Sequence, residues 1–318
     1  MKNRIAVALC GILCSLFAAA ICQAADEQSF VRTEDVVYGR KFGTALTLDV
    51  FTPRANANGA AVVWVVSGGW FSAHEAINPG YPAEFLNRGY TVFAVVHGSQ
   101  PLYTIPEVLG DMHRAIRYIR YHAADYKIDP NRIGITGGSA GGHLSLMQGT
   151  AGNDGTPDAK DPVERVSSRV QAVACFYPPT DFLNYGKTGE NALGRGVLAG
   201  FRAPFAFKEL DKTVNAFVPI TDEERILEIG RRISPIYQVT KDDAPALIIH
   251  GDADKLVPIQ QAETLVAKLK EAGVTAELVV KPGAAHGWKD QGKDMPSFAD
   301  WFDKYLAAPA PKGLGGQQ

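Results

Sequence analysis

The sequence has little cysteine and no marked excess of charge of either sign. Four of its 318 residues are cysteine, and three of these lie within the first 24 residues. If that segment is removed, Cys175 is the one cysteine left, so no disulfide can form within the mature chain. The net charge is −2, or about −4 without the first 24 residues, and no basic patch favours a nucleic-acid partner. No cluster of His, Cys and carboxylate residues has zinc spacing, so we expect neither a metal nor another cofactor.

Residues 1–24 differ in composition from the rest of the chain. Lys2 and Arg4 precede an uncharged apolar run from Ile5 to Ile21, and Cys22-Gln23-Ala24 places small residues where a signal peptidase reads them. This pattern predicts a removed signal peptide and a secreted or periplasmic protein without stable membrane insertion. An uncleaved anchor is the alternative, because the run is just long enough to span a bilayer.

The remaining chain predicts one domain at residues 25–306, followed by a disordered tail at residues 307–318 that is rich in Ala, Pro and Gly. Apolar β-rich runs alternate with helical patterns, which predicts an α/β fold with a mostly parallel central sheet and helices on both faces. Thr104 and Glu107 form a capping box before an apolar stripe of helical spacing. The run from Thr44 to Phe51 predicts an antiparallel edge strand.

The most informative motif is Gly137-Gly138-Ser139-Ala140-Gly141, set between a β-branched run and an apolar helical stretch. In this context G-x-S-x-G is typical of a nucleophile elbow, where small residues let a strained strand-to-helix turn close around an exposed serine. Ser139 would lie at a helix N-terminus, where negative charge is stabilised. The alternative is a glycine-rich loop with an incidental serine.

The candidate acid lies after the buried strand expected at residues 246–249. In hydrolases with this elbow, the acid and then a histidine follow the serine along the chain. Asp252 and Asp254 both qualify. We favour Asp254, because it lies further from the strand end and can reach back across the sheet, whereas Asp252 can satisfy loop amides.

The candidate base is His286, which follows a β-rich run at residues 277–281. His143 lies one helical turn after Ser139, but a base must approach the hydroxyl from above the sheet with its other nitrogen held by an acid. We therefore interpret His143 as packing beneath the elbow. His250 is interpreted as a brace for the acid loop.

An oxyanion hole needs two backbone N–H groups, one from the residue after the nucleophile and one from a glycine-rich loop after an earlier strand. Ala140 would supply the first. The loop Ser67-Gly68-Gly69-Trp70 follows a buried run at residues 61–66, and its glycines let the backbone approach a substrate closely.

Taken together, these motifs resemble the α/β-hydrolases of the carboxylesterase and hormone-sensitive-lipase type, and within them bacterial feruloyl and acetylxylan esterases close to the prolyl-oligopeptidase catalytic domain. The resemblance spans roughly residues 50–306. It rests on these segments: Gly68-Gly69-Trp70, Asp129-Pro130-Asn131-Arg132-Ile133, Gly138-Ser139-Ala140-Gly141-Gly142-His143-Leu144, Ser234-Pro235-Ile236, and His250-Gly251-Asp252-Ala253-Asp254 through Val257-Pro258.

The resemblance implies roles for particular residues of this chain. Ser139, Asp254 and His286 fall on the nucleophile, acid and base positions, and Gly68, Gly69 and Ala140 fall on the oxyanion positions. One departure stands out, because the family loop usually reads His-Gly-Gly-Gly-Trp. Here Val66 occupies the position of the histidine that braces this loop, and Ser67 that of the first glycine.

An insertion at residues 181–232 exceeds what the basic fold requires between two strands. It holds scattered glycines, a helix-like end and several phenylalanines, among them Phe201 and Phe205. Ligands bind at the carboxyl ends of the strands in open α/β sheets. We therefore expect this insertion to form a cap over Ser139, with Phe201, Phe205 and Trp70 contacting the substrate. The alternative is a peripheral decoration.

The expected function is that of a secreted serine esterase working through an acyl-enzyme. The resemblance suggests acetyl or feruloyl esters of plant polysaccharide, or small esters. A prolyl-oligopeptidase-like serine peptidase is a second hypothesis, although those enzymes usually carry a large N-terminal propeller, for which the chain has no room before its first expected strand. A third is a non-catalytic binding protein on a hydrolase fold, but such proteins typically lose a triad member.

Overall fold

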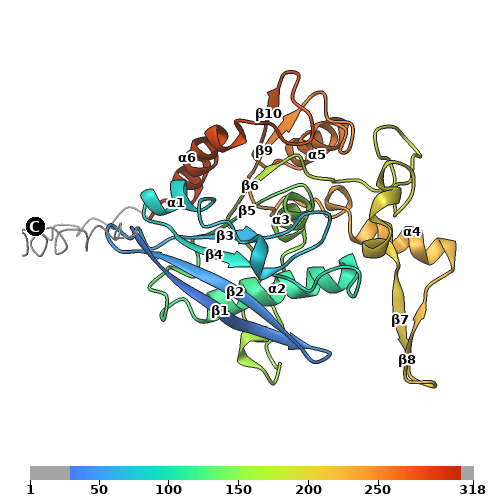
Figure 1. The fold of residues 1–318 in the computed structure, drawn as a ribbon, viewed down its shortest axis with the longest axis horizontal. Coiled ribbons are helices and arrows are strands. Elements are labelled where there is room, and N and C mark those ends of the chain that lie inside the picture. Colours follow the sequence, from blue (N-terminus) through green and yellow to red (C-terminus); the bar gives the residue numbers. More distant parts are fainter. Residues whose placement is uncertain (1–28, 309–318) are drawn as a thin grey trace, which may run out of the picture.

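The computed structural model describes residues 29–308, so the predicted signal peptide and residues 309–318 of the predicted tail lie outside it (Figure 1). Its central sheet has eight strands in the order β1-β2-β4-β3-β5-β6-β9-β10. β1 and β2 run antiparallel to their neighbours, and the pairs from β4 to β10 are parallel. These strands are β1 (Phe30–Lys41), β2 (Thr44–Pro53), β3 (Ala61–Val65), β4 (Thr91–Val95), β5 (Ile133–Gly138), β6 (Ala172–Phe176), β9 (Ala246–Gly251) and β10 (Ala276–Lys281).

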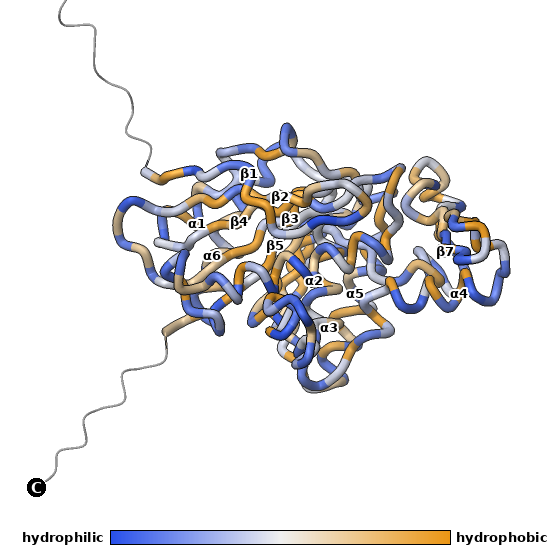
Figure 2. The backbone as a smooth tube through the Cα atoms, turned by 90° about the horizontal axis from the view of Figure 1, so that it is seen from below, coloured by the Kyte–Doolittle hydropathy of each residue, from blue (hydrophilic) through white to orange (hydrophobic). Residues whose placement is uncertain are grey.

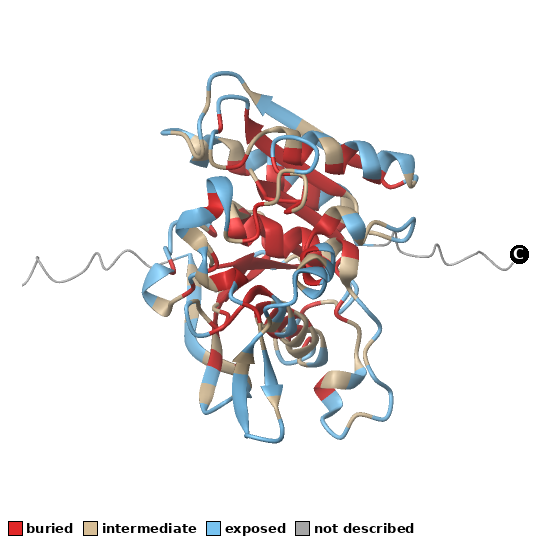
Figure 3. Ribbon diagram, turned by 90° about the vertical axis from the view of Figure 1, so that its right-hand side faces the viewer, coloured by how far each residue is buried: buried red, intermediate tan, exposed pale blue. Residues whose placement is uncertain are grey.

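Helices cover both faces of this sheet, as the alternating sequence pattern predicts. They are α1 (Ala83–Asn87), α2 (Ile105–Tyr121), α3 (Ala140–Ala151), α5 (Gln260–Glu271) and α6 (Met295–Tyr305). A further helix, α4 (Glu223–Arg232), lies away from the sheet, beside β7 in Figure 1. Successive strand residues alternate between two cores, because side chains of a strand point to opposite faces in turn. Val63 and Val65 belong to the core beneath α2, α3 and α5, and Val62 and Trp64 to the core beneath α1 and α6. Figure 3 shows the buried residues concentrated along these strands and the helix faces that cover them.

The capping box predicted before α2 is present. The Thr104 N–H donates to the Glu107 carboxylate at 2.7 Å, which satisfies a backbone donor at the helix start. Apolar residues of α2 such as Val108, Met112 and Ile116 are fully buried. Figure 2 shows the same alternation of hydrophobic and hydrophilic residues along this helix.

The edge of the sheet differs from the expectation. β2 was expected at the edge, but it pairs with β4 on one side and with β1 on the other. β1 gives little sequence signal, because most of its residues are exposed or half-buried and its register shifts twice against β2. The first strand of the sheet therefore precedes the one that hydrophobic patterning finds.

The insertion at residues 181–232 is built mostly of short pieces. It contains 3₁₀ turns at Gly196–Phe201 and Ala203–Phe205, a separate hairpin of β7 (Lys208–Asp211) and β8 (Ala216–Pro219), and then α4. Figure 1 shows the hairpin extending away from the central sheet. Across residues 29–308, no helix has both the length and the apolar character needed to cross a membrane.

Candidate active site

Ser139 lies in a sharp turn between β5 and α3. Its backbone has φ 54° and ψ −119°, a strained conformation for a residue with a side chain. The turn closes only because its neighbours are small: a Cβ on Gly137 would lie 2.6 Å from the Gly141 backbone, and one on Gly141 would lie 2.9 Å from the Val65 carbonyl oxygen. This is the geometry that G-x-S-x-G predicts for a nucleophile elbow.

The structure brings Ser139, His286 and Asp254 together. The Ser139 hydroxyl lies 2.9 Å from His286 Nε2, and His286 Nδ1 lies 2.7 Å from Asp254 Oδ2. Nδ1 must donate to the carboxylate, so Nε2 is left to accept the serine proton. Their loops follow β5, β9 and β10, whose carboxyl ends share one edge of the sheet.

The acid loop holds Asp254 as an anion. Its Oδ1 accepts the N–H groups of Leu256 and Val257, both at 2.9 Å. Burial acts to raise the pKa of Asp254, but hydrogen bonds from His250, His286 and Val257 outweigh it and hold this pKa well below its ordinary range. The carboxylate is therefore charged at neutral pH and can stabilise a histidine cation.

Asp252, the alternative acid, faces a different partner. Its carboxylate accepts the Gly283 N–H at 2.6 Å, which ties the acid loop to the turn before His286. This matches the expectation that a residue directly at the strand end satisfies loop amides.

Two other histidines have structural partners. His143 is fully buried, accepts a hydrogen bond from Trp70 Nε1 at 3.1 Å and donates to the Ile233 carbonyl at 2.7 Å. Burial lowers its pKa to about 4, although the bond to Ile233 acts the other way. His250 Nε2 lies 2.8 Å from the Val257 carbonyl oxygen, so its ring braces the acid loop.

Of the three backbone N–H groups expected to form the oxyanion hole near Ser139, two are free of backbone acceptors among the described residues. The Gly68 N–H donates to the Phe71 carbonyl at 3.0 Å and is therefore not available to a ligand, which corrects its expected oxyanion role. Gly69 and Ala140 donate to no backbone acceptor among the described residues. Ala140 opens α3, where a helix N–H has no partner within the helix. These two N–H groups form the candidate oxyanion hole.

His97, two residues after β4, is hydrogen-bonded to the glycine-rich loop. Its Nδ1 donates to the Gly98 carbonyl at 2.8 Å, so Nε2 accepts from the Ser67 hydroxyl, also at 2.8 Å. Its backbone N–H donates to Ser72 Oγ, which in turn donates to the Val66 carbonyl at 2.5 Å. His97 thus connects the loop to the sheet through Ser67, the residue after Val66, which stands where the related loop usually carries its own histidine. Sequence order gave no signal for His97, because it precedes the serine.

A cleft of about 580 Å³ opens above the Ser139 hydroxyl. Phe201 lines it and lies so close to the loop that a Cβ on Gly69 would meet its ring at 2.5 Å. Trp70 and Phe205, the other expected substrate contacts, are 2% and 7% exposed and do not line this cleft. Their rings pack edge-to-face, with centroids 5.2 Å apart. They attach the insertion to the domain.

One group of described residues has a geometry that could hold a cation. Ligand atoms of Glu34, Asp49 and His74 lie within 4.8 Å of one another. However, Arg32 already bonds Asp49 Oδ2 from Nε at 2.8 Å and from Nη2 at 2.5 Å. The guanidinium supplies the positive charge at this carboxylate, so the group forms an ion-pair cluster on the β1–β2 edge.

Known proteins resemble this chain along most of its length. LipM of Mycobacterium tuberculosis, a probable carboxylic ester hydrolase, is 28% identical over 77% of this chain and 53% of its own length. An acetylxylan esterase of Xylanibacter ruminicola is 28% identical over 81% of this chain and 47% of its own length. The chain therefore spans about half the length of these relatives.

Comparison with solved structures gives the same fold. A truncated carbohydrate esterase from gut microbiota superposes with a TM-score of 0.68 at 28% identity, covering 89% of this chain and 99% of the other. The fold is the α/β-hydrolase fold that the motifs imply. Residues 48–269, well over half of the chain, match the model of the BD-FAE family, and the chain belongs to that family.

Proposed function

We propose that this protein is a serine esterase that hydrolyses carboxylic esters through an acyl-enzyme. The observation that carries the proposal is the chain of hydrogen bonds from Ser139 through His286 to Asp254, with distances of 2.9 Å and 2.7 Å. Family membership and the ester hydrolases among its relatives support the same reaction class.

In the proposed mechanism, Ser139 Oγ attacks the ester carbonyl while His286 Nε2 takes its proton. Asp254 fixes the histidine tautomer and stabilises the resulting cation. The N–H groups of Gly69 and Ala140 stabilise the negative charge that develops on the carbonyl oxygen. His286 then protonates the leaving alcohol, and water, activated by the same histidine, releases the acyl group.

For the substrate, we propose an ester of a plant polysaccharide, with acetyl as the acyl group best supported. One relative is an acetylxylan esterase and one structural neighbour is a carbohydrate esterase. Feruloyl esters rest on the sequence resemblance alone. Polysaccharide is found outside the cell, which agrees with the predicted signal peptide and export.

Ser139→Ala tests the mechanism. We expect at least about a thousandfold loss of p-nitrophenyl acetate hydrolysis in a folded protein, because the hydroxyl is the attacking atom and the triad acts as a unit. A fluorophosphonate probe should label the unaltered protein and not the variant. Ser167→Ala, at a half-buried serine that does not line the cleft, is the matched control. Near-normal hydrolysis by folded Ser139→Ala would overturn the proposal.

A further inference from the structure

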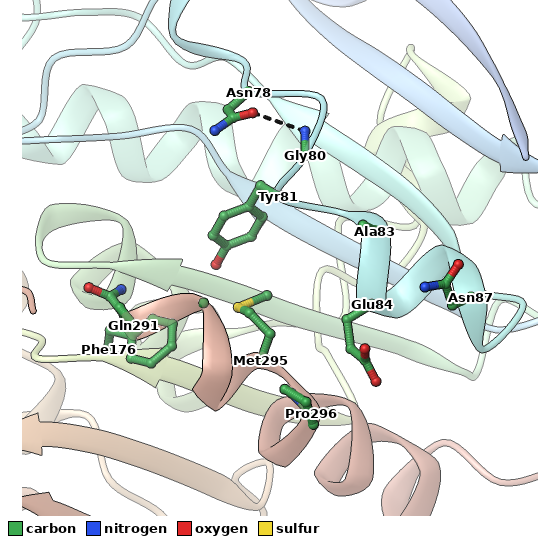
Figure 4. Close-up of a pocket in the computed structure, with 11 residues that line it drawn as sticks. Asn78, Gly80, Tyr81, Ala83, Glu84, Asn87, Phe176, Gln291, Met295 and Pro296 are labelled. Carbon is green, nitrogen blue, oxygen red and sulfur yellow. Dashed lines mark hydrogen bonds between the residues drawn. The ribbon is translucent and has the colours of Figure 1, made fainter. Parts of the chain in front are cut away.

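A second cavity, of about 440 Å³, lies between α1 and the start of α6 (Figure 4). Its walls come from both sides: Asn78, Tyr81, Glu84 and Asn87 from the segment around α1, and Gln291 and Met295 from the segment before and at the start of α6. Both this cavity and the cleft above Ser139 have volumes typical of small-molecule sites, about 300–1,000 Å³.

The cavity adjoins the cleft above Ser139. Tyr81, Phe176 and Gln291 line both, so a ligand can extend from one into the other. Figure 4 shows Tyr81 and Gln291 approaching from opposite walls.

The rim that the cavity shares with the cleft lies close to His286, the residue that gives its proton to the leaving alcohol in the proposed mechanism. Gln291 accepts a hydrogen bond from the Tyr177 hydroxyl at 2.8 Å, and the Tyr177 ring centroid lies 4.5 Å from that of His286. A leaving alcohol takes its proton from the triad histidine. The alcohol part of an ester bound at Ser139 therefore points toward Tyr177 and Gln291, and the cavity beyond them is open to receive it.

The lining offers uncharged hydrogen-bonding groups. Asn78 Oδ1 accepts the Gly80 N–H at 2.9 Å, which leaves its NH₂ group to donate. The side-chain amide of Asn87 has no hydrogen-bond partner within residues 29–308, and it is exposed. Amide groups that donate and accept, beside an aromatic ring, suit the hydroxyls and the C–H faces of a polyol.

The charges disfavour an anionic ligand. None of the described lining residues is Lys, Arg or His, and Glu84 is the one ionisable carboxylate among them. Glu84 accepts from Arg88 Nε at 2.9 Å, and Arg88 also contacts Asp300 and Asp303 at 2.6 Å. This guanidinium is already paired with three carboxylates, so a phosphate or sugar acid would gain no free cation here.

We propose that this cavity is the subsite for a neutral sugar unit on the alcohol side of the ester, with Asn78 and Asn87 as its specificity-determining residues. The assignment rests on the proposed esterase function, since the side of the cleft is defined by proton transfer from His286. It predicts that the enzyme recognises the sugar that carries the ester as well as the acyl group.

The test compares two esters in one set of variants. In Asn78→Ala/Asn87→Ala, the ratio of kcat/KM for O-acetylated xylo-oligosaccharides to kcat/KM for p-nitrophenyl acetate should fall about tenfold, as expected for the loss of one or two neutral hydrogen bonds. Ala83→Trp, at an exposed position of the same wall, should lower the ratio by filling the cavity. Asn131→Ala, an exposed asparagine at the opposite end of the sheet, is the control.

A second measurement separates this proposal from the proposed function. Isothermal titration calorimetry should show that unesterified xylotetraose binds the unaltered protein. Its affinity for the double variant should be about tenfold lower. Unchanged binding and an unchanged ratio in folded variants would overturn the subsite while leaving the esterase intact. If the unaltered protein hydrolyses no ester, the proposed function fails, and the xylotetraose titration still decides whether the cavity binds sugar.

Discussion

The triad loops and the insertion at residues 181–232 occupy the same end of the molecule but are held in different ways. Each triad loop follows a strand of the central sheet. The Asp254 carboxylate, for example, accepts hydrogen bonds from two backbone N–H groups as well as from the His286 ring. The insertion instead packs buried side chains, Phe182 and Phe205 among them, into the larger core, and its own ion pairs, such as Arg225–Glu209, are exposed. Exposed pairs of that kind contribute only about 0–1 kcal/mol.

The two regions differ in how precisely their side chains must be placed. A proton transfer needs atoms within hydrogen-bond reach, so the residues of the proposed triad are fixed by several partners each. The insertion touches the cleft through Phe201, while its hairpin lies against the β1–β2 turn through Phe217 and Phe42, with ring centroids 5.3 Å apart. We therefore expect changes in the first region to abolish the reaction and changes in the second to alter substrate preference.

The largest effect is expected in the acid loop. Asp254→Asn should lower kcat on the order of ten thousandfold, the size found when the acid of a well-studied triad is replaced, because the amide no longer fixes the histidine tautomer. Asp252→Asn, two residues away and bonded to Gly283, should cost far less. The measurement is kcat for p-nitrophenyl acetate hydrolysis by both variants. If Asp252→Asn lost more activity than Asp254→Asn, Asp252 would be the acid of the triad.

A smaller loss of kcat is expected when His97, which contacts the loop that carries Gly69, is replaced. Losing one oxyanion donor costs about 10²–10³ in kcat, so His97→Ala, which only loosens the loop that carries Gly69, should cost roughly 10–100-fold in kcat with little change in KM. His97→Gln, which can still accept from Ser67, should recover part of the loss. The matched control is His113→Ala, a histidine bonded to Ser168 away from the cleft, which should affect stability and leave kcat near normal.

The same contact gives a pH prediction. Burial, with a smaller effect of nearby Lys41, lowers the pKa of His97 to about 4, even though its bond to Gly98 acts the other way. His97 is therefore neutral at neutral pH, and its Nε2 accepts from Ser67 until the pH falls to about 4. We therefore expect the ratio of kcat for the unaltered protein to kcat for His97→Ala to stay constant from pH 5 to 8, because His97 titrates below this range. A ratio of one throughout this range would mean that the loop does not depend on this histidine.

The smallest effect is expected in the insertion. Phe201→Ala should change the ratio of kcat/KM for p-nitrophenyl butyrate to that for p-nitrophenyl acetate by about tenfold, since burying one large apolar group contributes roughly 1.5–3 kcal/mol. Phe217→Ala, on the hairpin away from the cleft, is the control and should leave the ratio within about twofold. An equal shift in both variants would mean that the insertion acts as a whole rather than through Phe201.

Sequence patterns predicted the parallel sheet, its helices and the residues that meet at Ser139, because periodicity and chain order report on burial and on strand ends. They could not predict contacts made by the backbone of a loop. The bond from Gly68 to Phe71 removes one expected donor, and no spacing encodes it. His97 was missed because it precedes the serine. Composition indicates an aromatic cluster, but only packing places Phe201 in the cleft and buries Phe205.

Strand β1 has a consequence for how copies of this protein meet. It forms one edge of the described sheet, and an unpaired strand edge invites another chain to add to it. Two register shifts interrupt β1, and charged residues such as Arg32, Glu34 and Arg40 stand along it. An approaching strand would have to match an irregular ladder and desolvate these charges. The strand that hydrophobic patterning overlooked therefore protects the sheet against edge-to-edge aggregation.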